Sequence, residues 1–232
     1  MLSRIVRDPT GKTLRWSRWL AAVLGVAACR GLAEGAGPAA PIVWRLDNLQ
    51  SIGGQVAEVL GAPRVTAEAA VRFNGVGDGL ILPVDPLAGM AAFTIEALIR
   101  PEAGGATEQR FLHIEDQHGN RATMEIRLTS DRRWALDTFL LGGDSRRALL
   151  DRTRLHPADR WTWVALRYDG RRMTSFVNGV EELEGAVNVT PFAAGRTALG
   201  VRLNRVYWFK GAIREVRFQA RALAAADLQR TE

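Results

Sequence analysis

The segment Met124–Leu128 carries the side chains best suited to chemistry in this sequence. Apolar residues occupy its alternate positions, so Glu125 and Arg127 are predicted to point together to the opposite face of a strand. Hydrolysis of a glycosidic bond needs two carboxylates roughly 5 to 9.5 Å apart. The second outward position here is an arginine, although Asp137 on the next predicted strand could supply the second carboxylate. The same three side chains also fit a solvated charge cluster on an outer sheet face.

A second chemistry is removal of a proton next to a sugar carboxylate. A lyase of this kind needs a base such as His or Tyr, and a cationic or amide group that neutralises the carboxylate. Residues of the right types are His113, Arg127, Asn204, Tyr207 and Lys210. The chain contains no nucleophile elbow, no phosphate-binding glycine loop and no HExxH motif.

Binding of a glycan without catalysis is the third possibility. It uses exposed aromatic rings and planar polar side chains, which are present here as Tyr207, Trp208, Arg202 and Asn204. Arg202 and Asn204 alternate with apolar residues and are therefore expected to point toward a ligand. The alternative is that the two aromatic residues only cover the edge of the core.

The elements that must position these residues are β-strands. In Arg160–Val180, two alternating segments are separated by Asp169-Gly170, and Asn178-Gly179 follows the second, which predicts antiparallel strands joined by tight turns. About ten short strands are expected in all, with one helical turn over 222–230. Evenly spaced strands with turn signals between them predict an all-β, two-sheet antiparallel jelly-roll sandwich. The other predicted strands are 42–46, 71–75, 79–82, 93–100, 110–115, 122–129, 134–140, 197–203 and 212–218.

The N-terminal region is typical of an export signal. A basic stretch precedes the apolar run Trp19–Ala28, which is too short for a stable transmembrane helix. Cys29, the only cysteine, follows Val-Ala-Ala and resembles the lipidated residue of bacterial lipoproteins; cleavage a few residues later is the alternative. We therefore expect residues 1–40 to be signal and leader and 41–232 to be one domain. The expected location is periplasmic, outer-membrane-anchored or extracellular.

Net charge argues against a nucleic-acid partner. The chain has 31 basic and 25 acidic residues, but five of the basic residues and one acidic residue precede Cys29, so the remainder carries a net charge of only +2. These remaining charges are interspersed rather than clustered, unlike those of nucleic-acid-binding proteins.

Three segments resemble the laminin G-like jelly roll of the concanavalin A-like lectin and glucanase superfamily. They are Phe93–Pro101, the hairpin from Trp163 to Gly179, and Phe209–Phe218 with the turn at 221–228. The resemblance implies the fold over 42–230, but this fold hosts lectins, adhesion modules, hydrolases and lyases. It also implies that 207–211 could be part of the closing motif without any catalytic role.

The resemblance raises calcium as a possible cofactor, because laminin G-like domains often hold one at the sheet rim. Asn74 and Asp78 offer oxygen ligands, while an Asx turn in a glycine-rich hairpin is the alternative. The three histidines are scattered without the spacing of metal ligands.

The sequence thus predicts an exported, non-catalytic binding module for carbohydrate or a cell-envelope protein. Its predicted ligand-binding residues are Glu125, Arg127, Asp137, Arg202, Asn204, Tyr207 and Trp208. The alternatives are a lyase acting on an anionic glycan, with His113, Arg127, Tyr207 and Lys210 at its site, or a structural domain without a small ligand.

Overall fold

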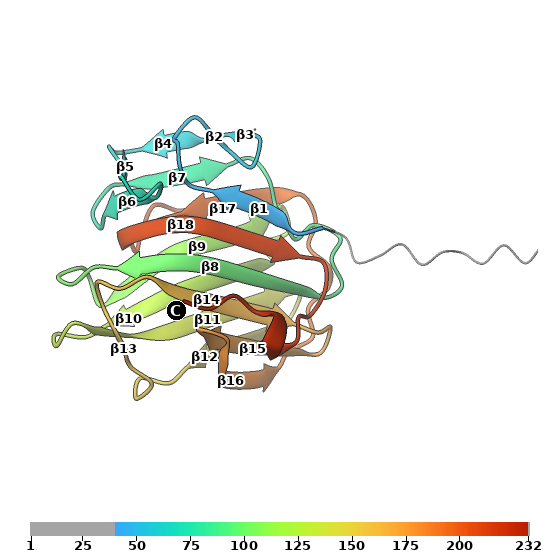
Figure 1. Ribbon diagram of the computed structural model, residues 1–232. Helices are drawn as coiled ribbons and strands as arrows, with labels where there is room; N and C mark the ends of the chain where they lie inside the picture. Colours follow the sequence, from blue (N-terminus) through green and yellow to red (C-terminus); the bar gives the residue numbers. More distant parts are fainter. Residues whose placement is uncertain (1–39, 232) are drawn as a thin grey trace, which may run out of the picture. The chain divides into compact units, whose positions relative to one another are not determined.

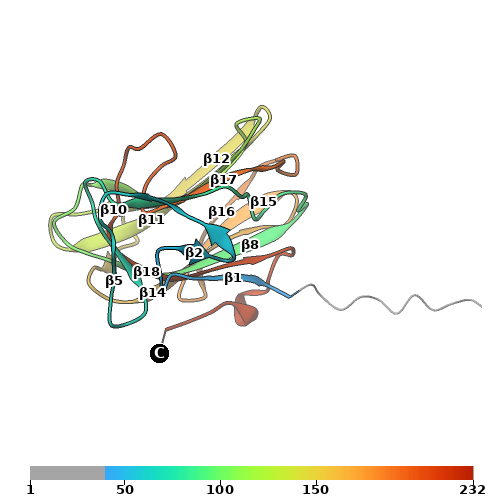
Figure 2. The same ribbon diagram turned by 90° about the horizontal axis from the view of Figure 1, so that it is seen from above.

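Two antiparallel sheets of eight strands each face one another in a jelly-roll sandwich (Figures 1 and 2). The structure is a computed structural model and describes residues 40–231. The predicted signal and Cys29 lie outside the described residues. A hairpin of β2 (Ser51–Ile52) and β3 (Gln55–Val56) forms a third, two-stranded sheet. The predicted all-β sandwich is confirmed.

The first sheet, here called the β8 sheet, is built around two long neighbouring strands, β8 (Phe93–Pro101) and β18 (Lys210–Gln219). The predicted hairpin β14 (Thr162–Tyr168) and β15 (Arg172–Val177) extends it on the β8 side, ending at β16 (Val180–Ala186). On the other side of β18 lie β1 (Ile42–Arg45), β6 (Val71–Asn74) and β5 (Arg64–Val65).

The second sheet, here called the β10 sheet, carries most of the predicted site residues. Its strand order is β12 (Ser145–Leu150), β11 (Arg133–Gly142), β10 (Arg121–Leu128), β9 (Glu108–Asp116), β17 (Gly195–Leu199), β7 (Gly79–Leu82) and β4 (Glu58–Leu60). The short strand β13 (His156–Pro157) pairs with β11.

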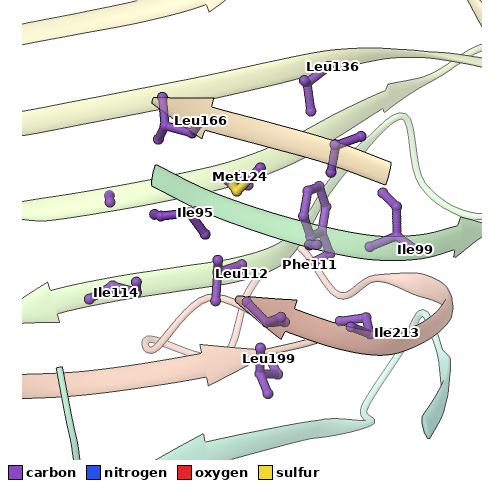
Figure 3. Close-up of a cluster of buried hydrophobic side chains, with 14 of the residues drawn as sticks. Ile95, Ile99, Phe111, Leu112, Ile114, Met124, Leu136, Leu166, Leu199 and Ile213 are labelled. Carbon is purple, nitrogen blue, oxygen red and sulfur yellow. The ribbon is translucent and has the colours of Figure 1, made fainter. Parts of the chain in front are cut away.

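The core lies between the two sheets and is filled by alternate residues of each strand. Figure 3 shows Ile95 and Ile99 of β8 among Leu112, Met124 and Leu136 of the β10 sheet, and all of these side chains are buried. Period-two alternation leaves every second residue on the outside. The strands that fill the core therefore also fix which side chains reach the outer faces.

The outer face of the β8 sheet is covered by the C-terminal segment (Figure 2). Leu223 and Leu228 bury against the sheet, and the backbone amide of Gln229 donates to Oε1 of the buried Glu96 at 2.7 Å. The helical turn expected over 222–230 is only a 3-10 turn at Ala225–Asp227. This segment therefore covers the part of the outer face formed by Ala165 of β14 and Phe176 of β15.

Several predicted strands were placed correctly; the errors include missed edge strands and one misplaced strand end. β16 and β12 were missed because each lies at the edge of its sheet, and β12 exposes three consecutive residues that show no alternation. The strand predicted over 197–203 ends at Leu199, because Gly200 has a φ of 76°. A Cβ at Gly200 would lie 2.4 Å from Cδ1 of Phe73, so the chain turns there only with glycine.

The predicted turns also differ in detail. Asn178 and Gly179 both have positive φ, as a two-residue hairpin turn requires, whereas at Asp169-Gly170 only the glycine does. Asp169 instead accepts the backbone amides of Arg171 and Arg172, both at 2.8 Å. Over residues 40–231, no helix has the length and hydropathy needed to cross a membrane.

Candidate functional site

A charged cluster occupies the outer face of the β10 sheet, where three neighbouring strands lie in register. Glu125 on β10 is opposite Arg110 on β9 and Asp137 on β11. Met124 and Ile126 are buried in the core, which confirms that Glu125 and Arg127 face away from it. The polar residues of these strands therefore meet on one surface.

Five of these side chains form a network of ion pairs. Nη2 of Arg127 lies 2.5 Å from Oδ2 of Asp137 and 3.2 Å from Oε2 of Glu125, and its Nη1 lies 3.0 Å from Oε2 of Glu108. Arg110 contacts Oε1 of Glu125 through Nε at 2.9 Å and Oε1 of Glu108 through Nη2 at 3.0 Å. Arg127 thus links three carboxylates, and Arg110 links two of the same three.

Burial makes this network electrostatically unusual. Glu125 and Asp137 are each only 4% exposed. Burial raises the pKa of Glu125 to about 7; Arg110 opposes this shift and the negative charge of Asp137 adds to it. Burial likewise raises the pKa of Asp137, against the attraction of Arg127. Buried carboxylates with raised pKa values are found preferentially at functional sites.

Several polar atoms of the network have no hydrogen-bond partner although they are buried. Nη1 of Arg110 and Nε of Arg127 are two of them. Oε2 of Glu125 and Nη1 of Arg127 also lack an aligned hydrogen bond, although each lies close to an opposite charge, at 3.2 Å and 3.0 Å. An unpaired buried polar atom costs about 1–3 kcal/mol. The network therefore gives up some stability to hold these charged groups together beside the cavity.

A loop from the end of β17 reaches over to the network. β9 contains a bulge, because Met124 pairs with Leu112 while the next residue, Glu125, pairs with Arg110. The loop docks at this bulge: the amide of Gly200 donates to the carbonyl of Phe111 at 3.0 Å, and the amide of Arg110 donates to the carbonyl of Tyr207 at 2.9 Å. The Tyr207 ring then lies over the Arg110 guanidinium, 3.9 Å from ring centroid to Cζ.

The network, the loop and β12 enclose a cavity of about 180 Å³ that opens to solvent. Its lining includes Glu125, Arg127, Asp137 and Arg202, four of the seven predicted ligand-binding residues, together with Arg110 and Arg121. Pockets that bind drug-sized ligands have volumes of about 300–1,000 Å³. The cavity is therefore large enough for part of a small polar ligand, such as one sugar unit.

The other predicted ligand-binding residues do not belong to the lining of this cavity. Tyr207 is 41% exposed and covers Arg110. Trp208 packs against a small buried cluster that includes Val201, so it supports the loop. Asn204 lines a separate hollow with Glu115 and Gln117.

Of the four residues of the lyase alternative, Arg127 lines the cavity and Tyr207 covers Arg110, whereas His113 is buried and Lys210 lies beside Gly104. His113 is 1% exposed, and burial followed by the charges of Arg202, Arg121 and Arg110 lowers its pKa to about 3. Nζ of Lys210 lies 3.4 Å from the carbonyl oxygen of Gly104, and Lys210 pairs with Asn74 on β6.

The oxygens proposed as calcium ligands are already used by the backbone. Oδ1 of Asn74 accepts the amides of Val76, Gly77 and Asp78 at 2.9 to 3.2 Å. The two carboxylate oxygens of Asp78 accept the amides of Ala62 at 2.8 Å and Asn74 at 3.0 Å. This is the Asx-turn alternative, and these two residues do not fit a calcium ion.

A larger hollow, of about 590 Å³, lies elsewhere and includes Glu68, Arg100 and His156 in its lining. These three charged groups have partners: Arg100 lies 2.6 Å from Glu68, and Nε2 of His156 lies 2.7 Å from Glu182. None of the buried atoms that lack a hydrogen bond belongs to this lining. We therefore assign the candidate site to the smaller cavity.

Sequence reasoning missed Arg110 and Arg121 as site residues. Arg121 lies at an outward position of the same strand as Glu125 and Arg127, so extending the alternation by two steps would have found it. Arg110 was hidden because the bulge shifts the pairing of β9 by one residue. Only knowledge of the bulge places it beside Glu125.

The raised pKa of Glu125 predicts an unusual pH dependence of stability. The folded state holds the proton of Glu125 more tightly than the unfolded chain does, where a glutamate carboxyl has its ordinary pKa of 4.5. This difference adds to the free energy of unfolding below pH 4.5, and the contribution is lost as the pH rises through about 7. Asp85, whose pKa burial raises to about 6, acts in the same direction.

We expect urea unfolding at a series of pH values to show wild-type stability falling between about pH 4.5 and pH 7, and Glu125→Gln to show a clearly flatter curve. The exposed variant Glu58→Gln should follow the wild type. Parallel curves for Glu125→Gln and wild type would disprove this assignment.

Comparisons with known proteins agree with the architecture. The laminin G-type family model described as "Concanavalin A-like lectin/glucanases superfamily" matches residues 74–229. No curated protein matches the chain. Among solved structures, domain 4 of the extracellular arabinanase AbnA from Geobacillus stearothermophilus, in complex with arabinotriose, is 22% identical with a TM-score of 0.55; the match covers 80% of this chain and 94% of that one.

Two further structures are similar in fold. The binding domain of botulinum neurotoxin DC in complex with SialylT is 13% identical with a TM-score of 0.59, and the match covers 81% of this chain and 49% of that one. Trypanosoma rangeli sialidase in complex with sialic acid is 16% identical with a TM-score of 0.57, covering 79% and 31%. The chain thus spans about half or less of these two proteins. From the family match and the sandwich itself, the chain belongs to the concanavalin A-like lectin/glucanases superfamily.

Proposed function

We propose that this protein binds carbohydrate without transforming it, through the cavity on the outer face of the β10 sheet. The observation that carries the proposal is the set of charged side chains that line the cavity, with Glu125 and Asp137 as hydrogen-bond acceptors and arginines as donors. A sugar hydroxyl both donates and accepts hydrogen bonds, so adjacent hydroxyls of one sugar can pair with both kinds of group.

The rigidity of the site also supports binding. Charged side chains that face an aqueous cavity normally lose rotamer freedom when a ligand binds. Here Glu125, Arg127 and Asp137 already hold one another in place, and Tyr207 fixes Arg110 from the other side. These groups lose most of their conformational entropy when the protein folds. Ligand binding therefore orders them little further, and less of the contact energy is offset.

The ion pairs argue for binding rather than hydrolysis. A general acid must give up its proton to the leaving group, and a nucleophile must be free to attack. Arg127 contacts both Asp137 and Glu125, so neither carboxylate is free of a guanidinium. The similarity to structures solved with arabinotriose and sialic acid adds support for a carbohydrate ligand.

We further infer that the protein meets its ligand outside the cytoplasm, because residues 1–28 have the basic and apolar regions of an export signal. Lipidation at Cys29 or cleavage after it would give different mature masses. Intact-mass measurement of the protein recovered from bacterial cells therefore tests export, and an unprocessed chain would contradict it.

The binding proposal is tested with an oligosaccharide array followed by calorimetry on the glycans that bind. Ala148 is exposed at the cavity wall, so Ala148→Trp should fill the opening and weaken binding at least about tenfold, equal to about 1.4 kcal/mol. Val56→Trp, on the exposed β2–β3 hairpin, is the matched control and should bind like wild type.

Two results would count against the proposal. Equal affinity of Ala148→Trp and wild type for every bound glycan would place binding elsewhere on the molecule. Recovery of shortened or unsaturated products from a bound glycan would show catalysis. Circular dichroism of each variant checks that the sandwich remains folded.

A further inference from the structure

The arginines of the cavity are not equally well paired. Arg110 and Arg127 each lie within 3.0 Å of a carboxylate oxygen. Arg121 has only Oε2 of Glu115, at 3.9 Å from its Nη1. The guanidinium of Arg202 has no ion pair and no hydrogen bond within residues 40–231. Arg121 and Arg202 therefore bring nearly uncompensated positive charge to the same cavity.

These two positive charges also repel one another. The pKa of Arg121 is lowered by burial first and by the charge of Arg202 second, with Arg110 and Arg146 adding to the shift. The pKa of the buried His113 is lowered by burial and by three of the same arginines. A folded protein that keeps like charges together at a partly buried position gives up stability there. An anionic ligand would convert this repulsion into attraction.

We propose that the sugar bound in this cavity is acidic, and that Arg121 and Arg202 bind its anionic substituent while Glu125 accepts a hydrogen bond from a hydroxyl of the same ring. This inference rests on the proposed function and names its ligand class. The shared chemistry is a ring-linked carboxylate or sulfate. Guanidinium groups bind either with paired, charge-assisted hydrogen bonds, which are about twice as strong as neutral ones.

The arrangement of the cavity matches a ligand that carries both kinds of group. The Arg121–Arg202 side is positive, whereas Glu125 and Asp137 hold acceptors in the network. A fully anionic ligand would be repelled by these two carboxylates. A neutral ligand would leave Arg121 and Arg202 without an ion-pair partner. An acidic sugar places its charge on one edge of the ring and its hydroxyls on the others, so it fits both sides at once.

The test compares three ligands of one backbone: an oligogalacturonide, its carboxyl-reduced neutral counterpart, and a sulfated galactose oligosaccharide of equal length. Calorimetry should give at least about tenfold tighter binding of an anionic ligand than of the neutral one. The two anionic arms distinguish carboxylate from sulfate. Comparable affinity for all three ligands would overturn the inference.

Arginine variants test whether the preference for an anionic ligand arises in this cavity. Arg202→Gln should bind the anionic and the neutral ligand with about equal affinity, whereas Arg146→Gln should keep the preference for the anionic one. Arg146 is the matched control because it is an arginine close enough to lower the pKa of Arg121, yet it does not line the cavity. An equal loss in both variants would indicate non-specific charge attraction, and no loss in either would remove Arg202 from the site.

A measurement without ligand gives an independent check. If Arg121 and Arg202 repel one another, Arg202→Gln should melt at a temperature about 1 °C or more above wild type at low salt, and the gain should shrink as salt screens the charges. A lower melting temperature would show that Arg202 supports the fold instead.

The outcomes separate this inference from the function on which it rests. In one outcome, the neutral ligand binds as tightly as the anionic ones and loses affinity in Ala148→Trp. That result would support the carbohydrate site but reject the acidic ligand. Failure to bind any of the three ligands, together with a blank array, would reject both.

Discussion

Replacing Arg127 with methionine is expected to lower the free energy of unfolding by about 3–5 kcal/mol at pH 8, the cost of removing one member of a buried ion-pair cluster. Arg127 contacts Glu108, Glu125 and Asp137, and the last two are only 4% exposed. Without its guanidinium, these carboxylates keep only Arg110 as a close cation. Urea unfolding followed by fluorescence measures the difference.

The pH dependence of this loss identifies its cause. Burial already raises the pKa of Glu125 to about 7 and raises that of Asp137, and removal of Arg127 should raise both further. At pH 5 the two groups can then take up protons, which removes the unpaired charge. The destabilisation by Arg127→Met should therefore be smaller at pH 5 than at pH 8.

The control is Arg172→Met, because the Arg172–Glu184 pair has the same charge chemistry but a 57% exposed arginine side chain. Exposed pairs contribute about 0–1 kcal/mol, so this variant should differ little from wild type. If Arg127→Met also cost less than about 1 kcal/mol at pH 8, the cluster would be a solvated surface network and its proposed rigidity would be wrong.

Phe209→Ala should be comparably destabilising, by about 3–5 kcal/mol. Phe209 is fully buried, with its ring centroid 6.4 Å from that of Phe73 and 5.9 Å from that of Phe111. It also closes the loop, because its amide donates to the carbonyl of Gly200 at 2.8 Å. Its removal leaves a cavity between the two sheets at the base of the loop that carries Arg202.

This variant should lose ligand affinity as well as stability, since the loop is held to β9 at Phe111 and Arg110. Val206→Ala, an exposed change in the same loop, should alter neither quantity by much. Binding is measured at a temperature where circular dichroism shows Phe209→Ala to be folded. Wild-type affinity in that folded variant would show that the loop holds its position without this anchor.

The fold was largely predictable from the sequence because its signals are local. Alternation in 93–100 and 122–129, and turn dipeptides such as Asn178-Gly179, depend on neighbouring residues and on the period of a strand. The edge strands β12 and β16 escaped prediction because an edge strand needs no apolar alternation to pair through its backbone.

The candidate site was predictable only in part. Placing Glu125 and Arg127 on one outer face required no more than strand periodicity. Adding Asp137 to them required the pairing of β10 with β11. This pairing is easy to predict, because the two strands follow one another in the sequence. Arg202 was predicted as a ligand-binding residue, but its place beside these strands depends on a loop that crosses from a strand two positions away. Arg110 could not be assigned to the cavity, since its position depends on a bulge.

By itself, then, the sequence determined a two-layer β-sandwich and the outward direction of the charges on its central strands, because both follow from interactions within a few residues. The tertiary structure decided which charges meet, how deeply Glu125 and Asp137 are buried, and that Arg121 and Arg202 share one cavity. Those properties depend on strand register, on the β9 bulge and on the docking of the 200–209 loop, which join residues up to about a hundred positions apart. Electrostatic energies vary steeply with such distances and with burial, so the chemistry of the site appears only once the chain has folded.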